Sequence, residues 1–316
     1  MGEYPKTLTE LESCFSTEEA CRGYLAKLRW PEGFRCPRCG YDKAWTSRKT
    51  LYECGRCGRQ VSVTAGTIFQ RTHKPLRMWF RAIWWVTSQK PGVSALGLRV
   101  TLGLGSYRTA WVWLHKLRRA MVRPGRDRLS GRIEVDETYF GGRAEGHEGR
   151  RRGDKTLIVI AAQEDGGKIG RIRMQRVPDA SAKSLEAFVM QAVEPGSVIH
   201  TDGWSGYAGL KALGYFHEST PQKRLDVPGA EEDLLPRVHR VVSLLKRWVM
   251  GTHQGGVSHE HLDYYLDEFT FRFNRRTSQH RGKLFYRLMQ QAVNVAPTRY
   301  VDLVKGVRGR MRHNRK

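Results

Sequence analysis

The sequence has no long hydrophobic run. None of its 316 residues belongs to an apolar stretch of the roughly 18 residues that a membrane-spanning helix needs. The first residues, MGEYPKTLTELESCF, lack the basic start and the apolar centre of a secretory signal. We therefore expect no membrane partner and a cytoplasmic location.

Cysteine and acidic residues are both scarce. Six cysteines in a chain expected in a reducing compartment are poor candidates for disulfides, which leaves metal binding to be examined. Asp and Glu total 31 against 55 Lys and Arg, a formal net charge of +24. With nine Trp as well, this excess favours nucleic acid as the partner. The alternative is a generic basic protein that binds nucleic acid nonspecifically. Such a protein would not need acidic residues within its strands, and this sequence has them, as described below.

Four of the cysteines form two pairs with metal-binding spacing. Cys36 and Cys39 enclose two residues, as do Cys54 and Cys57, and 14 residues separate the pairs. A glycine follows each pair, so two turns can present four thiolates to one tetrahedral Zn²⁺. Four thiolates leave no open coordination position, so the zinc is expected to be structural. We predict a zinc ribbon over residues 31–70.

Residues 1–30 are expected to contain a helix. Ser16 is a candidate N-cap, and Glu19, three residues later, would complete a capping box. Cys14 and Cys21 lack a partner at metal-binding spacing, so we expect both to be small core residues.

Residues 71–125 are expected to be helical too. An aromatic-rich helix over 76–87 precedes a helix over 94–100, a glycine-containing turn and a helix over 107–121. This order favours a helix-turn-helix whose second helix enters a major groove. An ordinary helical hairpin is the alternative, but the adjacent ribbon and the positive charge favour DNA binding.

Strands and helices alternate from residue 130 to residue 280. The expected strands are 133–140, 156–163, 171–176, 197–201 and 215–217, and the expected helices include 184–193 and 207–213. Three strands, a helix and a further strand are the order of the RNase H-like fold. We therefore predict an α/β fold class with a mixed five-stranded sheet, followed by a basic tail over 281–316.

Two aspartates stand out in this region. Asp136 lies inside the apolar strand of GRIEVDETYFGG, and Asp202 follows the fourth strand in GSVIHTDGWSGY. Burying a carboxylate is costly unless it binds a metal or joins a hydrogen-bond network. Either aspartate alone could be a satisfied structural acid. The pair, followed by a helix with another candidate ligand, favours metal-dependent phosphoryl chemistry.

That helix begins near Arg237 and is amphipathic. Its valines and leucines recur at spacings of three and four residues. His239 and Lys246 are seven residues apart, which is two turns, so they lie on one face. A further helix is expected over 260–273.

Together these segments resemble insertion-sequence transposases with an N-terminal zinc ribbon and an RNase H-like DDE domain. The resemblance extends from about Arg29 to Arg276. It rests on RWPEGFRCPRCG, TAGTIF, VDETYFGGR, HTDGWSGY, and LLKRWVMGTHQG followed by DEFTFRFNRR. In such enzymes the first two aspartates hold divalent metal, usually Mg²⁺, and Asp136 and Asp202 match them.

The third metal-ligand position departs from the family pattern. The family commonly has Glu or Asn seven residues before a lysine that ends an LLK run, and here His239 precedes Lys246. The resemblance therefore implies a DDH variant that uses Mg²⁺ or Mn²⁺. His239 is a third ligand, a proton shuttle or a sign of lost activity. Glu231, Glu232 and Asp233 are nearby carboxylates that could replace it.

The function implied by the resemblance is DNA transposition. The protein would bind terminal inverted repeats and catalyse metal-dependent strand cleavage and transfer, with Lys246 next to the cut. Its partners would be double-stranded DNA, as transposon ends and target, and further copies of itself in a dimer or higher multimer. Such a protein would be nucleoid-associated in a bacterium or archaeon. The alternatives are a DNA-binding regulator with a degenerate catalytic domain and an RNase H-like structure-selective nuclease.

Overall fold

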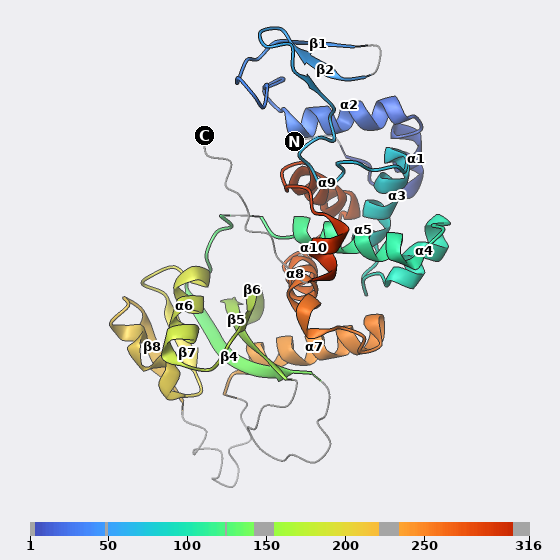
Figure 1. The fold of residues 1–316 in the computed structure, drawn as a ribbon. Helices are drawn as coiled ribbons and strands as arrows, with labels where there is room; N and C mark the ends of the chain where they lie inside the picture. The colour runs from blue at the N-terminus through green and yellow to red at the C-terminus, as the bar shows by residue number, and fades with distance from the viewer. Residues whose placement is uncertain (1–3, 48–49, 124, 142–154, 221–233, 306–316) are drawn as a thin grey trace. The chain divides into compact units, whose positions relative to one another are not determined.

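The computed structural model describes residues 4–47, 50–123, 125–141, 155–220 and 234–305 (Figure 1). It divides into two compact units. The split unit consists of residues 1–124 together with 277–316, and the inserted unit consists of residues 125–276. The chain therefore leaves the first unit, builds the second and returns. No described helix is long and apolar enough to cross a membrane.

The split unit contains a small sheet and several helices. In chain order its elements are α1 (Leu8–Cys14), α2 (Glu18–Arg29), β1 (Ala44–Thr46), β2 (Tyr52–Cys54), β3 (Gln60–Val61), α3 (Leu76–Ser88), α4 (Ala95–Leu102), α5 (Tyr107–Ala120), α9 (Arg281–Ala292) and α10 (Tyr300–Val304). The three strands form an antiparallel sheet in the order β1-β2-β3. These strands have only two or three residues each, so this sheet offers little core of its own.

The start of α2 differs from the sequence prediction by one residue. The N-cap is Thr17, whose side-chain oxygen accepts a hydrogen bond from the backbone of Ala20, and not Ser16. Cys21, on this helix, is fully buried as expected, but Cys14 is exposed. The expectation of a core cysteine is therefore wrong at Cys14.

The segment 281–316 differs from the expected basic tail. It begins with α9, which packs against α2, α3 and α5 (Figure 1). The Phe285 ring lies 5.9 Å from the rings of Phe80 and Trp84 and 6.1 Å from the ring of Phe15. The return of the chain thus completes the aromatic core of the split unit. Residues 306–316 of this segment lie outside the described residues.

The expected helix-turn-helix corresponds to α4 and α5. Gly103, with φ of 61°, ends α4 in the left-handed region, and Ser106 caps α5. The body of α5 packs into the split unit, and its exposed residues are Tyr107 and Arg108, in the first turn. Arg118, one of several basic residues on this helix, is only 1% exposed. If α5 acts as a recognition helix, only its first turn is exposed for contact with the major groove.

The inserted unit is built on a five-stranded sheet. Its elements are β4 (Arg132–Phe140), β5 (Thr156–Asp165), β6 (Lys168–Val177), α6 (Ala182–Ala192), β7 (Val198–Thr201), the 3₁₀ helix η1 (Ser205–Lys211), β8 (Phe216–Ser219), α7 (Pro236–His253), the 3₁₀ helix η3 (His259–His261) and α8 (Leu262–Phe273). The strand order is β6-β5-β4-β7-β8, with β4, β5 and β6 antiparallel and β4, β7 and β8 parallel. The predicted α/β, RNase H-like fold class with a mixed sheet is confirmed.

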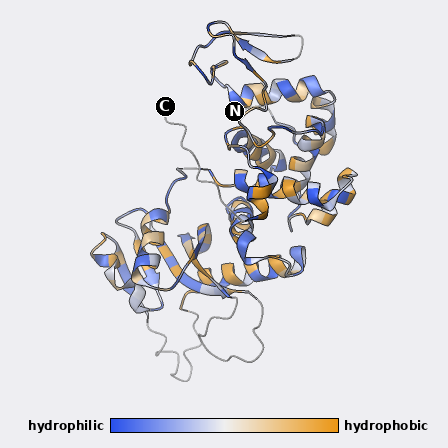
Figure 2. Ribbon diagram, viewed as in Figure 1, coloured by the Kyte–Doolittle hydropathy of each residue, from blue (hydrophilic) through white to orange (hydrophobic). Residues whose placement is uncertain are grey.

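Helices cover both faces of this sheet. Val135 and Val159 point into a core shared with α6 and η1, whereas Ile158 and Ile160 point into one shared with α7 and α8. β5 is therefore almost continuously apolar, as a strand covered on both faces must be. By contrast, α7 carries hydrophobic and hydrophilic residues along its length (Figure 2). The apolar residues of α7 pack on the sheet, and its hydrophilic residues are available to form a functional site.

Candidate functional site

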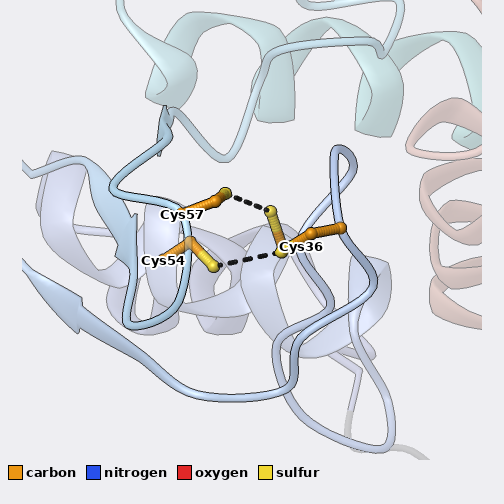
Figure 3. A group of neighbouring side chains, drawn as sticks. Cys36, Cys54 and Cys57 are labelled. Carbon is orange, nitrogen blue, oxygen red and sulfur yellow. Dashed lines mark hydrogen bonds between the residues drawn. The ribbon is translucent and has the colours of Figure 1, made fainter.

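The four predicted zinc ligands come together in the split unit. Their sulfur atoms all lie within 4.8 Å of one another. The sulfur of Cys36 is 3.6 Å from that of Cys57 (Figure 3). The sulfur of Cys39 is likewise 3.6 Å from that of Cys54. Tetrahedral zinc with Zn–S bonds of about 2.3 Å requires sulfur separations of about 3.8 Å. The donor set therefore fits a structural Zn²⁺.

Asp136 lies in the middle of β4, opposite Ile160 of β5. Because side chains alternate along a strand, Ile133 and Val135 enter the core beneath α6, whereas Glu134 and Asp136 face α7. The Asp136 side chain is 17% exposed. The strand thus holds a largely buried carboxylate with one edge open to solvent.

Asp202 directly follows β7, the parallel neighbour of β4. Glu134 pairs with His200 across these strands, and Asp136 and Asp202 each lie two residues further on. Continued two residues past this pair, the register brings Asp202, just beyond the end of β7 at Thr201, level with Asp136. One oxygen of Asp202 accepts a hydrogen bond from the backbone of Trp204 at 3.0 Å.

His239 lies on α7, which crosses β4 and β5. Its Nε2 is 3.4 Å from an Oδ of Asp136, and its side chain is 51% exposed. The valines and leucines of α7 pack on the face of these two central strands. The helix therefore covers the face of the sheet and not its edge.

A shallow depression of about 470 Å³ connects the predicted residues of α7 with β4. Its lining residues are Asp136, Thr138, His239, Val242, Ser243 and Lys246. Lys246 thus shares the surface of His239, as their spacing predicts. Asp202 is not one of the lining residues. The structure brings Asp136, His239 and Lys246 to one surface and places Asp202 at the end of the adjacent strand.

Glu134 holds the start of α7, a role that was not predicted from the sequence. Its carboxylate accepts hydrogen bonds from the backbone N–H groups of Arg237 and Val238, at 2.7 and 2.9 Å. It also accepts one from the Arg237 guanidinium at 2.7 Å. The carboxylate is therefore fully engaged, although the residue is only 4% exposed. Its signal was its position, two residues before Asp136 on the same face.

Glu137 points to the opposite side of β4. Its carboxylate accepts a 2.8 Å hydrogen bond from the hydroxyl of Tyr207, a buried residue of η1. Burial, reinforced by the charges of Asp136 and Asp202, raises the pKa of Glu137, although the Tyr207 hydrogen bond opposes that shift. Burial and the adjacent Glu137 likewise raise the pKa of Tyr207. This bond ties the segment that follows Asp202 to the strand that carries Asp136.

Comparison with known proteins agrees with this architecture. Residues 128–274 match the ISXO2-like transposase domain, and residues 16–60 match the transposase zinc-ribbon domain. The fold and these matches define a transposase of an insertion sequence. The chain belongs to the family with an N-terminal zinc ribbon and an RNase H-like DDE-type domain.

A relative from an archaeon matches most of the chain. It is an uncharacterized protein in the transposable element ISH50 of Halobacterium salinarum, 26% identical over 282 residues. The match covers 82% of this chain and 91% of the relative. The similarity therefore extends beyond the zinc ribbon and the transposase domain to nearly the whole relative.

Proposed function

We propose that this transposase binds the terminal inverted repeats of its element and catalyses metal-dependent strand cleavage and strand transfer. The observation that supports the proposal is the position of Asp136 on β4 and of Asp202 directly after β7, the adjacent parallel strand. His239, within 3.4 Å of Asp136, adds a third donor from α7.

The donor set suits a divalent cation. Asp136, Asp202 and His239 would hold Mg²⁺ or Mn²⁺, with carboxylate oxygens suited to both and the imidazole better suited to Mn²⁺. When bound, two such ions supply an activated water or 3′-hydroxyl and stabilise the leaving oxygen. Lys246, on the rim of the same depression, would bind a phosphate next to the cut.

Double-stranded DNA is the proposed substrate, as transposon ends and target. The net charge of +24 favours binding to phosphates, with release of counterions. The exposed first turn of α5, with Arg108, is a candidate contact to a groove. Because transposition joins two ends to one target, we also propose that the protein acts as a dimer or higher multimer.

The experiment measures cleavage and binding separately. Repeats that flank the gene are located first, and a duplex with one such end is incubated with the purified protein and Mg²⁺ or Mn²⁺. Asp136→Asn and Asp202→Asn should each slow cleavage by about 100-fold or more, because each removes a charge from the metal site. Binding across a salt series should match that of the wild type.

Asp165→Asn is the matched control. It makes the same change of charge in the same sheet, at the exposed end of β5, and should leave cleavage unchanged. Cleavage at the wild-type rate by Asp136→Asn or Asp202→Asn would exclude the proposed site. A wild-type protein that binds the ends without cutting them would instead be a regulator with a degenerate site.

A further inference from the structure

Glu134 is a buried acid outside the proposed metal-ligand set. It is 4% exposed, lies on β4, and has three hydrogen-bond donors within 2.9 Å, all from the first turn of α7. Two of these donors are backbone N–H groups. A hydrogen bond to a backbone N–H fixes the position of the helix itself, whereas a bond to a side chain can be kept while the helix shifts, because the side chain can change its rotamer.

The first turn of α7 needs this acceptor. The first N–H groups of any helix have no partner within the helix. The N-cap position of α7 is Leu235, which makes no side-chain cap, and Pro236 occupies the first turn. The Glu134 carboxylate supplies the missing cap, and its negative charge is favourable at the positive end of the helix dipole.

The same strand therefore presents Asp136 and holds the helix that presents His239. Glu134 and Asp136 are two residues apart on one face of β4, and their partners Val238 and His239 are consecutive on α7. We propose that Glu134 is a positioning residue, which sets His239 over Asp136 by anchoring the start of α7. This proposal rests on the proposed function of the metal site.

Arg237 links the anchor to further charges. Its guanidinium bonds Glu134 at 2.7 Å and Glu164 of β5 at 2.6 Å. Glu164 thus binds the same guanidinium as Glu134 but accepts no hydrogen bond from the two backbone amides. Glu164→Gln is therefore a matched control, since it removes an ion pair of Arg237 and leaves the helix cap.

The first test is kinetic. Glu134→Gln keeps the shape of the side chain but removes its negative charge and leaves one acceptor oxygen for the two amides and the Arg237 guanidinium, so cleavage should fall about 10- to 100-fold while DNA binding is retained. The cleavage rate of Glu164→Gln should fall much less. Glu134→Asp, which keeps both acceptor oxygens, should recover part of the loss, and it carries the test if Glu134→Gln does not fold.

A double variant shows whether Glu134 acts through His239. If it does, Glu134→Gln combined with His239→Ala should cleave no more slowly than His239→Ala alone. Losses that multiply, or a Glu134→Gln variant slower than His239→Ala, would overturn the proposal. If Glu134→Gln merely destabilised the whole protein, its loss of activity would multiply with that of His239→Ala in this way.

The second test does not depend on activity. Amide hydrogen exchange at Arg237 and Val238 should be faster in Glu134→Gln than in the wild type, and unchanged in Glu164→Gln. Unchanged exchange in Glu134→Gln would overturn the anchor even in an active enzyme. If exchange is faster in Glu134→Gln but the wild-type protein does not cleave DNA, the anchor is retained and the proposed function is rejected.

Discussion

Glu134 and Glu18 use their carboxylates in the same way. Each caps a helix from a distant part of the chain: Glu134 is 103 positions before Arg237, and Glu18 is 58 positions before Leu76. Glu18 accepts hydrogen bonds from the first two amides of α3, at 2.9 and 3.0 Å, where Pro75 provides no cap. These glutamates fix α2 against α3 and β4 against α7. Their substitution therefore affects how helices are placed as well as local stability.

His239 is the residue whose role is most open to a direct test. His239→Ala should reduce cleavage by about tenfold or more, because it removes a donor beside Asp136. His239→Glu restores the carboxylate that the family pattern commonly has at this position. If His239 is a ligand, this variant keeps or regains cleavage with Mg²⁺, whereas a dedicated proton shuttle predicts its loss.

The rates of both variants should be measured with Mg²⁺ and with Mn²⁺. His239→Ala would lose more activity with Mn²⁺ if the imidazole binds the softer ion. Wild-type cleavage by His239→Ala would remove the histidine from the site. The acidic residues 231–233 would then be the next candidates, and they lie outside the described residues.

Several site residues could be predicted because local sequence marks them. Asp136 is a charge within an apolar strand, and His239 and Lys246 share a face through their seven-residue spacing. Glu134 could not be found in that way. Its partners are more than 100 residues away, and an acid on alternate positions of a strand is typical of a solvent-facing side chain. Only the position of α7 gives it a function.

At the scale of elements, most helices and strands begin close to the residues predicted for them. The exceptions involve basic residues. The sequence predicts a basic tail over 281–316, but this segment begins with α9, in which Leu284, Phe285 and Leu288 recur at helical spacing and are buried. Arg118 of α5 lies in the core, with its guanidinium 3.4 Å from Nε2 of His115, one turn earlier on the same helix. Arginine is mostly exposed in proteins, so its burial could not be predicted from the sequence of this helix.

The ribbon is the element whose stability should depend most on metal. Its strands are too short to supply a core, so the four thiolates provide the main connection between its two turns. Metal analysis of the purified protein should find about one zinc per chain. Cys39→Ser should lose most of it, because a hydroxyl is a poor replacement for a thiolate. Cys14→Ser is the control and should retain the zinc, since Cys14 lies outside the cluster. If a variant without Cys36, Cys39, Cys54 and Cys57 still bound zinc, this assignment would be rejected.

At the scale of the whole molecule, the split unit depends on contact between its two chain segments. The rings of Tyr4 and Tyr286 stack at 5.8 Å. A Cβ atom added to Gly282 of α9 would overlap the backbone oxygen of Pro5. Gly282→Ala should therefore destabilise the protein by about 1–3 kcal/mol, which urea unfolding would measure. Gly23→Ala on α2 adds its Cβ to open space and should instead be neutral or stabilising by up to about 1 kcal/mol; equal stabilities of the two variants would contradict the close packing at Gly282.

The division of the split unit also sets an order of events during protein synthesis. A ribosome releases α1 to α5 first, then the whole inserted unit, and only afterwards α9, which carries Phe285 into the aromatic core. A nascent chain that ends within the inserted unit therefore leaves this core unfinished and open to degradation. We therefore expect few incomplete chains to survive. The topology thus makes completion of the aromatic core of the split unit depend on translation of the whole inserted unit.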